Sequence, residues 1–230
     1  MKNLLLSTLL AALPAAAAPL VARSGPARAS LVELYSSEGC SSCPPADAWV
    51  SSLAGAPGLF KDFTPVVFHV AYWDYLGWKD PLAAPENAAR QRAYAASWGT
   101  GSVYTPGFVR DGAEWRGWGG AAPKAGPPAG ILEASFDGRK VVARFDVKGD
   151  RLTVHAARLG FGVSTKVAAG ENEGRTLRHD FVVLAQASAP LARGRAALEL
   201  PAARVGAPKE GFAVWVTDGD GRVLQSAGAR

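Results

Sequence analysis

The two cysteines of this 230-residue chain are separated by two residues and lie where a strand-like segment meets a helix-like one. The segment Leu31 to Ser36 is short and mostly apolar, which predicts a strand. Pro44 and Pro45 follow the second cysteine directly, and proline is tolerated in a helix only in its first turn. The helix should therefore run from near Cys43 to about Leu53, with the motif Cys40-Ser41-Ser42-Cys43 at its start.

The cysteine count and the composition restrict the class of protein. Two cysteines are too few for a disulfide-dense mini-protein or an all-cysteine zinc module, since each needs at least about four. The 26 glycines and 16 prolines make up roughly 18% of the chain, below the level that marks a low-complexity sequence. Because 48% of the residues are hydrophobic, the chain can bury a core as one large domain or as two of ordinary size.

The net charge of +5 is scattered along the chain rather than gathered in basic runs. Nucleic-acid recognition usually requires a basic patch or stripe. We therefore expect a solvated, mildly basic surface and no nucleic-acid partner.

Residues 1–18 have the three-part layout of a secretory signal peptide. The cation Lys2 is followed by the apolar stretch from Leu4 to Leu13, and small residues end the segment at Ala18. The apolar stretch is about half the length of roughly 20 residues that a membrane-spanning helix needs. We expect cleavage near Ala18, a periplasmic or secreted protein, and no stable membrane span afterwards.

The rest of the N-terminal half reads as alternating strands and helices. Glu86 gives one helix good start chemistry, and Gly99 closes it. The predicted segments are a strand over Pro65 to Ala71, an aromatic loop from Tyr72 to Asp80, a helix opened by Pro85, and a strand and turn over Thr105 to Gly112 hairpinned to Glu114 to Trp118.

The pattern changes after a proline-interrupted stretch from Gly119 to Gly130, which is the candidate linker. Residues 140–148 alternate between apolar and polar side chains, and no helical pattern follows. Further strand-like runs lie at 152–155 and near 161–168, 176–185, 195–200 and 212–217. We therefore expect an α/β domain over 28–120, with a mixed sheet and flanking helices, and an all-β, antiparallel, sandwich-like domain over 131–228.

The placement of the cysteines favours redox chemistry. A cysteine at a helix start faces unsatisfied N–H groups and the positive end of the helix dipole, which stabilise the thiolate. Cys40 would then attack a disulfide, and Cys43, one turn further in, would resolve the mixed disulfide. Two alternatives stay open: a metal site, with copper held by the two thiols and a distant histidine such as His69, or a fixed structural disulfide.

Several other residues are candidates for the same site. Glu33 lies in a strand that should be buried, where it would serve either as proton acceptor for Cys43 or as a salt-bridge partner of Arg90 or Arg92. His69 is expected to be a satisfied core histidine. His155 and His179 are expected to be structural.

The aromatic loop follows the carboxyl end of a strand, where ligands of open α/β sheets gather. Trp73, Tyr75 and Trp78 would form a partner-binding lip over the dithiol, or else cap the core.

The order of these segments, with Thr105-Pro106 opening a strand before Asp-Gly, resembles the thioredoxin fold. More specifically, Val32 to Tyr35 running into Glu38 to Asp47, together with His69 to Pro81, Val103 to Pro106 and Gly170 to Leu177, resembles the secreted thioredoxin-like family catalogued as domain of unknown function 1223. The resemblance implies a thioredoxin-like fold, a cis bond at Pro106, and a substrate-binding role for Thr105 and Pro106 beside the cysteines.

Together these features predict an exported thiol-disulfide oxidoreductase that acts on protein or small-molecule thiols and disulfides. No cofactor is expected. The alternatives are a copper-binding protein that uses the same thiols, and a non-catalytic interaction module with a fixed disulfide.

Overall fold

The computed structural model describes residues 18–147 and 149–230. The predicted signal peptide lies outside these residues except for Ala18. Among the described residues, no helix combines the length and the apolar character needed to cross a membrane.

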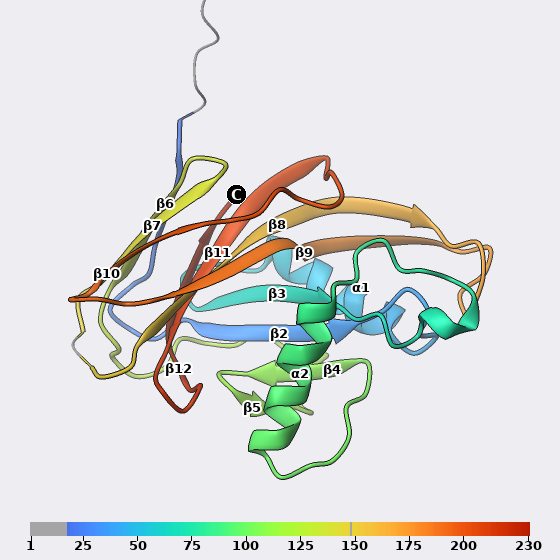
Figure 1. Ribbon diagram of the computed structural model, residues 1–230, viewed down its shortest axis with the longest axis horizontal. Helices are drawn as coiled ribbons and strands as arrows, with labels where there is room; N and C mark the ends of the chain where they lie inside the picture. The colour runs from blue at the N-terminus through green and yellow to red at the C-terminus, as the bar shows by residue number, and fades with distance from the viewer. Residues whose placement is uncertain (1–17, 148) are drawn as a thin grey trace, which may run out of the picture.

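A large mixed sheet runs through the centre of the molecule (Figure 1). Its eight strands lie in the order β12-β11-β8-β9-β3-β2-β4-β5. From the N-terminal half come β2 (Ser30–Ser36), β3 (Phe63–His69), β4 (Gly107–Arg110) and β5 (Ala113–Glu114). From the C-terminal half come β8 (Thr153–Lys166), β9 (Thr176–Pro190), β11 (Lys209–Thr217) and β12 (Val223–Ala229).

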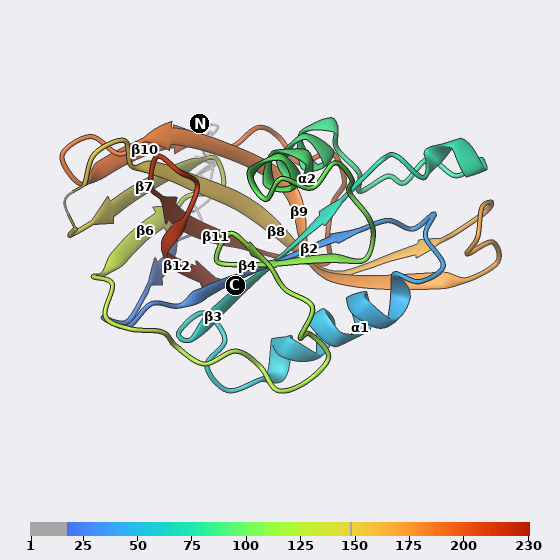
Figure 2. The same cartoon turned by 90° about the horizontal axis from the view of Figure 1, so that it is seen from below.

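The two α-helices cover opposite faces of this sheet (Figure 2). Helix α1 (Pro44–Ser52) starts with its two prolines in the first turn and continues into the 3₁₀ turn η1 (Leu53–Gly55). Helix α2 (Pro85–Ser97) also begins at a proline. Both helices agree with the sequence prediction to within two residues.

Strands β2 and β3 are parallel, and Ser36 lies opposite His69 at their carboxyl ends. Every residue of both strands is buried. This is expected of strands covered by helices on both faces, and it explains why their sequences are almost continuously apolar. Buried polar residues in these strands, such as Glu33 and His69, are the exceptions that need partners.

A second sheet is antiparallel and has the order β1-β6-β7-β10. Its strands are β1 (Leu20–Arg23), β6 (Leu132–Phe136), β7 (Lys140–Phe145) and β10 (Arg195–Glu199). Its apolar side chains pack against those of β11 in one core cluster, for example Phe136 against Phe212 at 5.4 Å between ring centroids. The mixed α/β character and a small antiparallel sheet are therefore confirmed.

The expected separation of the two halves into different sheets is wrong. β9 pairs with β3 at Val67 and Val182, so the large sheet continues across residues 119–130. Only β6, β7 and β10 of the C-terminal half belong to the small sheet, and β1 from the start of the described chain completes it. The physical reason is that β3 carries apolar side chains on both faces and needs a neighbour on each edge.

Several strand boundaries also differ from the prediction. Residues 152–155 and 161–168 were expected as two strands, but they form the single strand β8, whose pairing with β9 shifts register around Gly160 and Gly162. Gly162 has a φ of +66°, a conformation that glycine adopts without steric cost. Strands β1, β6 and β12 were not predicted.

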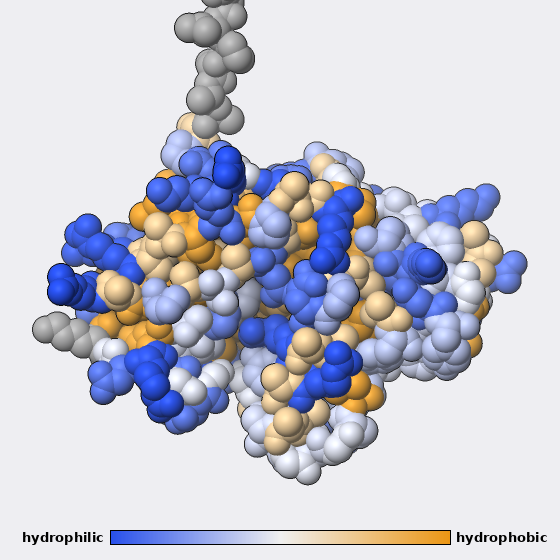
Figure 3. Space-filling view, in the orientation of Figure 1, coloured by the Kyte–Doolittle hydropathy of each residue, from blue (hydrophilic) through white to orange (hydrophobic). Residues whose placement is uncertain are grey.

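The surface mixes polar and apolar residues. On the face seen in Figure 3, hydrophilic residues lie between smaller apolar areas. This agrees with the scattered charge of the sequence.

Candidate functional site

The two cysteines form a disulfide bond at the start of α1. Their Cα atoms are 5.5 Å apart, and both residues are fully buried, while Ser41 and Ser42 between them are exposed. Cys40 and Cys43 are thus equally buried in this oxidised state. The disulfide is covered rather than presented to solvent.

Segments far apart in the sequence meet around the disulfide. The loops after β2 and β3 and the β8–β9 turn lie at the same end of the molecule (Figures 1 and 2). In the β8–β9 turn, Asn172 is buried and donates its side-chain amide to the carbonyl oxygens of Glu38 and Cys40, both at 2.9 Å. Glu171 accepts the backbone N–H of Ser41 at 2.8 Å. The turn thus fixes the backbone of the cysteine loop.

Sequence reasoning did not assign Glu171 or Asn172 to the site. Their segment was noted only because it resembles the family's pattern. Nothing in local sequence shows that a turn about 130 residues after the cysteines bonds to them.

Thr105 lies beside the disulfide, and its peptide bond to Pro106 is cis, as the resemblance implied. The carbonyl oxygen of Thr105 is 3.8 Å from the sulfur of Cys40. The Ser42 hydroxyl is 3.3 Å from the same sulfur and donates to the Thr105 carbonyl at 3.5 Å. The structure therefore brings Thr105 and the cysteine pair together.

The aromatic side chains of the loop from Tyr72 to Asp80 make two different sets of contacts. The indole N–H of Trp73 donates to the Thr105 hydroxyl at 2.8 Å, and Tyr75 stacks on Trp73 with its side chain 76% exposed. Trp78 instead donates its indole N–H to the buried carboxylate of Glu38 at 2.8 Å. Trp73 and Tyr75 thus border the disulfide region, while Trp78 supports a buried carboxylate.

The buried carboxylate of Glu33 is surrounded by hydrogen-bond donors. Its carboxylate accepts two bonds from Arg90, at 2.7 and 2.9 Å, and one hydroxyl each from Tyr35 and Tyr94. Burial raises the pKa of Glu33, but the charge of Arg90 and these hydrogen bonds outweigh it and lower the pKa overall. The salt bridge with Arg90 is thus formed, and both Arg90 and Tyr94 belong to α2. Helix α1 covers the opposite face of the sheet (Figure 2).

A buried polar cluster lies on the α1 side, at the carboxyl ends of β2 and β3. His69 and His179 meet edge to face, with ring centroids 4.7 Å apart. The Nδ1 atom of His69 is 2.7 Å from Asp80, and the Nε2 atom of His179 is 3.2 Å from Glu38. Asp47 of α1 accepts the Ser36 hydroxyl at 2.7 Å, and its other carboxylate oxygen is 3.7 Å from Nδ1 of His179.

The charges of the cluster are coupled. Burial lowers the pKa of His179, but the nearby carboxylates of Asp47 and Glu38 outweigh burial and raise the pKa to about 9. Burial raises the pKa of Asp80, but His69 and backbone N–H groups lower it overall. His69 is thus buried and bonded, as predicted, but it and His179 belong to one cluster, which sequence reasoning did not foresee.

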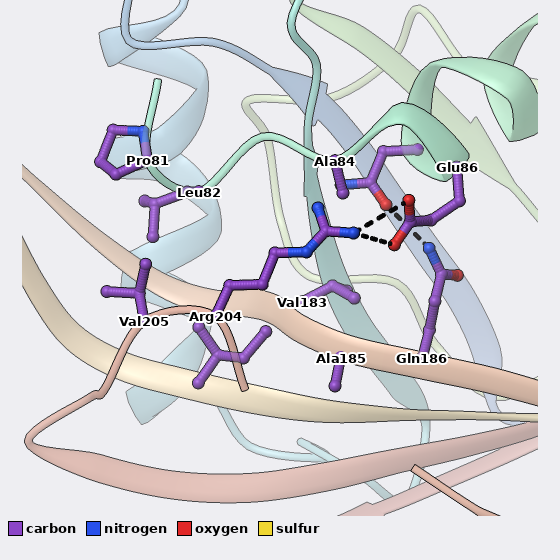
Figure 4. Close-up of a pocket in the computed structure, with 11 residues that line it drawn as sticks. Pro81, Leu82, Ala84, Glu86, Val183, Ala185, Gln186, Arg204 and Val205 are labelled. Atoms are coloured by element: carbon purple, nitrogen blue, oxygen red, sulfur yellow. Dashed lines mark hydrogen bonds and ion pairs between the residues drawn. The ribbon is translucent and has the colours of Figure 1, made fainter. Parts of the chain in front are cut away.

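A metal ion near this cluster would need several side-chain ligands, and an organic cofactor would need a cavity large enough to hold it. One ligand atom from each of Asp47, His69 and His179 lies within 4.8 Å of the other two, and no other such group of three occurs in the described part of the chain. Arg204 lines the nearby pocket in Figure 4 and pairs there with Glu86 at 2.9 Å. Its volume of about 20 Å³ leaves room for about one water molecule, so it is too small for an organic cofactor.

Comparisons with known proteins agree on the fold and leave the activity open. No curated protein matches the chain significantly. Among solved structures, protein AGR_C_4864 from Agrobacterium tumefaciens is similar, with a TM-score of 0.62 and 24% identity, covering 88% of this chain and 94% of that chain. HBP35 of Porphyromonas gingivalis is similar with a TM-score of 0.55 and 12% identity, covering 89% of this chain and 76% of that chain. At these identities the two structures support the fold alone.

The family assignment comes from the sequence match. Residues 31–217 match the family described as "Protein of unknown function (DUF1223)". Because this match spans most of the chain, the protein belongs to the DUF1223 family.

Proposed function

We propose that this protein is an exported, thioredoxin-like thiol-disulfide oxidoreductase that uses the Cys40–Cys43 pair. The observation that carries the proposal is the position of the disulfide: it lies at the start of α1, with the Thr105 carbonyl 3.8 Å from the sulfur of Cys40. A helix start stabilises a thiolate, and so short a disulfide loop adds little stability by constraining the unfolded chain. The substrates would be protein or small-molecule thiols and disulfides.

The chemistry needs only the two cysteines and a partner. A thiolate of the partner attacks the sulfur of Cys40, a new S–S bond forms, and the bond to Cys43 breaks, releasing the Cys43 thiolate. A second partner thiolate then attacks the partner's sulfur in this mixed disulfide and releases Cys40. The protein gains two electrons, the partner is oxidised to a disulfide, and the reverse sequence reduces a partner's disulfide.

The covered disulfide implies that the partner must uncover Cys40. Ser42 and the Trp73 loop border the sulfur of Cys40, and Tyr75 presents an exposed ring next to them. A bound partner that displaces the Ser42 hydroxyl would open the sulfur to attack. Trp73 and Tyr75 are the residues that we assign to the partner-binding lip.

The test combines a potential with a trapping experiment. The reduction potential of the pair is measured against glutathione, and a Cys43→Ser variant is expressed in the exporting host to retain mixed disulfides on Cys40. The Cys40→Ser/Cys43→Ser double variant is the control, because it cannot form any mixed disulfide. We expect trapped partners that reductant releases and that the double variant lacks.

The complete burial of both cysteines favours a second candidate, an interaction module with a fixed disulfide. A potential below about −300 mV together with no trapped partner would support that candidate and reject the oxidoreductase. Metal uptake that requires the reduced thiols would instead support the copper-binding alternative.

Export is part of the proposal because it decides the redox environment. A thiol pair outside the cytosol can be oxidised and remain so. Mass spectrometry of the exported protein should find a new N-terminus near Ala18, and an intact Met1 would reject the proposed cleavage.

A further inference from the structure

Asp47, His69 and His179 come from three different elements and converge in the interior of the protein. Asp47 is on α1, His69 ends β3 and His179 is in β9. One ligand atom from each lies within 4.8 Å of the other two, and each of the three residues is at most 7% exposed. The folded chain thus places two imidazoles and one carboxylate around a single point.

Both histidines have an unused nitrogen. The Nε2 atom of His69 and the Nδ1 atom of His179 are buried without a hydrogen-bond partner. Buried polar atoms in proteins are nearly always paired, so an unpaired nitrogen on each of two adjacent imidazoles requires an explanation. A bound cation that accepts both lone pairs supplies one.

The opposite nitrogen of each ring is held by a carboxylate. His69 uses Nδ1 toward Asp80 at 2.7 Å, and His179 uses Nε2 toward Glu38 at 3.2 Å. This is the outer-shell arrangement of metal-bound histidines, in which a carboxylate fixes the ring and its tautomer while the other nitrogen binds the ion. Asp47 is oriented in the same way, by the Ser36 hydroxyl at 2.7 Å.

The buried charge of the cluster also favours a cation. Three buried carboxylates, Glu38, Asp47 and Asp80, have histidines as their only ionic partners among the described residues. Buried carboxylates that lack arginine or lysine partners are costly unless another cation balances them. A divalent ion between these side chains would supply that charge.

We propose that Asp47, His69 and His179 bind a divalent transition-metal ion of the zinc class. Two imidazoles and one carboxylate suit such an ion, whereas Mg²⁺ and Ca²⁺ prefer oxygen ligands throughout. Zn–N and Zn–O bonds of about 2.0–2.2 Å place tetrahedral ligand atoms roughly 3.3 Å apart. The three atoms are within 4.8 Å in this structure, so binding would draw them together.

This site differs from the copper alternative considered from the sequence. That alternative used the two thiols with His69, and it required the reduced protein. The site proposed here leaves the disulfide intact and is independent of the proposed redox function.

The test uses the oxidised wild-type protein, because its disulfide cannot ligate a metal. Protein stripped with a chelator is titrated with Zn²⁺ by calorimetry and with Co²⁺ by visible absorption. We expect one equivalent of Zn²⁺ to bind, and Co²⁺ to give d–d bands without a thiolate charge-transfer band. Absence of Zn²⁺ binding by the folded, oxidised wild type overturns the proposal.

The chain offers a matched control, since it contains three histidines and only His155 is outside the cluster. His69→Gln and His179→Gln should each weaken Zn²⁺ binding by more than the ~10–100-fold that loss of an outer-shell partner costs. His155→Gln and the Cys40→Ser/Cys43→Ser double variant should bind as the wild type does. Equal binding by all four variants, or loss in the cysteine variant alone, contradicts the proposed ligands.

A measurement on the wild type avoids variants that fail to fold. With ¹⁵N-labelled histidine, Zn²⁺ should shift the ring nitrogens of His69 and His179 and leave those of His155 unchanged. Shifts confined to His155, or no shifts at saturating Zn²⁺, would also reject the site.

Discussion

At the scale of single residues, two groups of buried polar side chains lie on opposite sides of the large sheet. On one side of the large sheet, Glu33 and Arg90 form an ion pair with two tyrosine hydroxyls around it. On the other side, Asp47 of α1 meets His69 and His179. The first group pairs the Glu33 carboxylate fully, whereas the second leaves one buried nitrogen on each histidine without a hydrogen-bond partner.

Loss of Arg90 should be strongly destabilising. Arg90→Met would leave the fully buried Glu33 carboxylate without its cation, at a cost of about 3–5 kcal/mol in the free energy of unfolding. Urea unfolding of Arg90→Met, Glu33→Leu and the double variant measures the coupling between the two residues. The double variant should be more stable than Arg90→Met alone. Additive losses in the cycle would show that the pair is not energetically coupled.

His155 should make stability depend on pH. Its ring stacks on Trp215 and its Nε2 atom is 3.0 Å from the Thr217 hydroxyl. Burial, helped by the charge of Arg90 and opposed by Glu33, lowers the pKa of His155 to about 4. Between pH 6.5 and 4 the unfolded state therefore binds a proton that the folded state does not, so stability falls as the pH falls through this window.

The matching experiment compares wild type with His155→Gln. Unfolding free energies at pH 7, 5.5 and 4 should show the wild type losing up to about 3 kcal/mol more than the variant across the window. Because other groups titrate equally in both proteins, parallel curves would show that His155 is not held neutral by the fold.

A substitution at Tyr75 should affect partner binding without affecting the stability of the fold. Its side chain is 76% exposed, so Tyr75→Ala should change the free energy of unfolding by less than about 0.5 kcal/mol. If Trp73 and Tyr75 form the lip, the variant should exchange disulfides with a trapped partner more slowly, while its exchange with a small thiol is unchanged. Equal rates with the protein partner would remove Tyr75 from the lip.

At the scale of elements, Gln225 of β12 joins two segments that are far apart in the sequence. The side-chain oxygen of its buried Gln225 accepts the N–H of Ala29 at 2.8 Å. The amide nitrogen of Gln225 donates to the carbonyl oxygen of Gly130 at 2.7 Å and contacts those of Ala27 and Gly25 at 3.2 and 3.3 Å. One side chain thus fixes the segment before β2 and the segment before β6.

Gln225→Leu should therefore loosen both segments. It leaves the buried Ala29 N–H and the Gly130 carbonyl without partners, at a cost of roughly 2–3 kcal/mol. Arg222→Ala, at an exposed position before β12, is the control and should stay within about 0.5 kcal/mol of wild type. Hydrogen exchange at Ala29 should become faster in Gln225→Leu only. Unchanged exchange would show that the glutamine does not hold this segment.

The elements that could be predicted were those with a strong local pattern. The two prolines fixed the start of α1, and continuous apolar runs revealed β2 and β3. Strand β1 is short, and β12 contains polar residues, such as Gln225 and Ser226, that are buried in the folded chain, so neither strand was predicted. The runs at 152–155 and 161–168 were predicted as two strands, but the register shifts around Gly160 and Gly162 are irregularities within the continuous strand β8.

At the scale of the whole molecule, one continuous large sheet contains strands from both halves of the chain. Phe181 and Trp215 from the C-terminal half pack in the same core cluster as Leu31, Tyr35 and Phe63 from the N-terminal half. The predicted regions 28–120 and 131–228 therefore share a core.

A shared core predicts one cooperative unfolding transition. Urea curves followed by far-ultraviolet circular dichroism and by tryptophan fluorescence should superimpose. The fragment 28–120 expressed alone should not fold, because β3 would lose the neighbour that β9 provides and expose apolar surface. Two separated transitions, or a folded fragment, would show that the halves are independent domains.

The sequence by itself determined the cysteine motif, its place between a strand and a helix, the ends of both helices and the α/β character of the N-terminal half. These follow from local rules, since proline geometry and apolar periodicity act over a few residues. Only the tertiary structure decided that β9 joins β3, that the β8–β9 turn fixes the cysteine loop, and that His69, His179 and Asp47 meet. Those contacts join residues distant in the sequence, and they form because buried strand edges and buried polar atoms must find partners wherever the fold brings them.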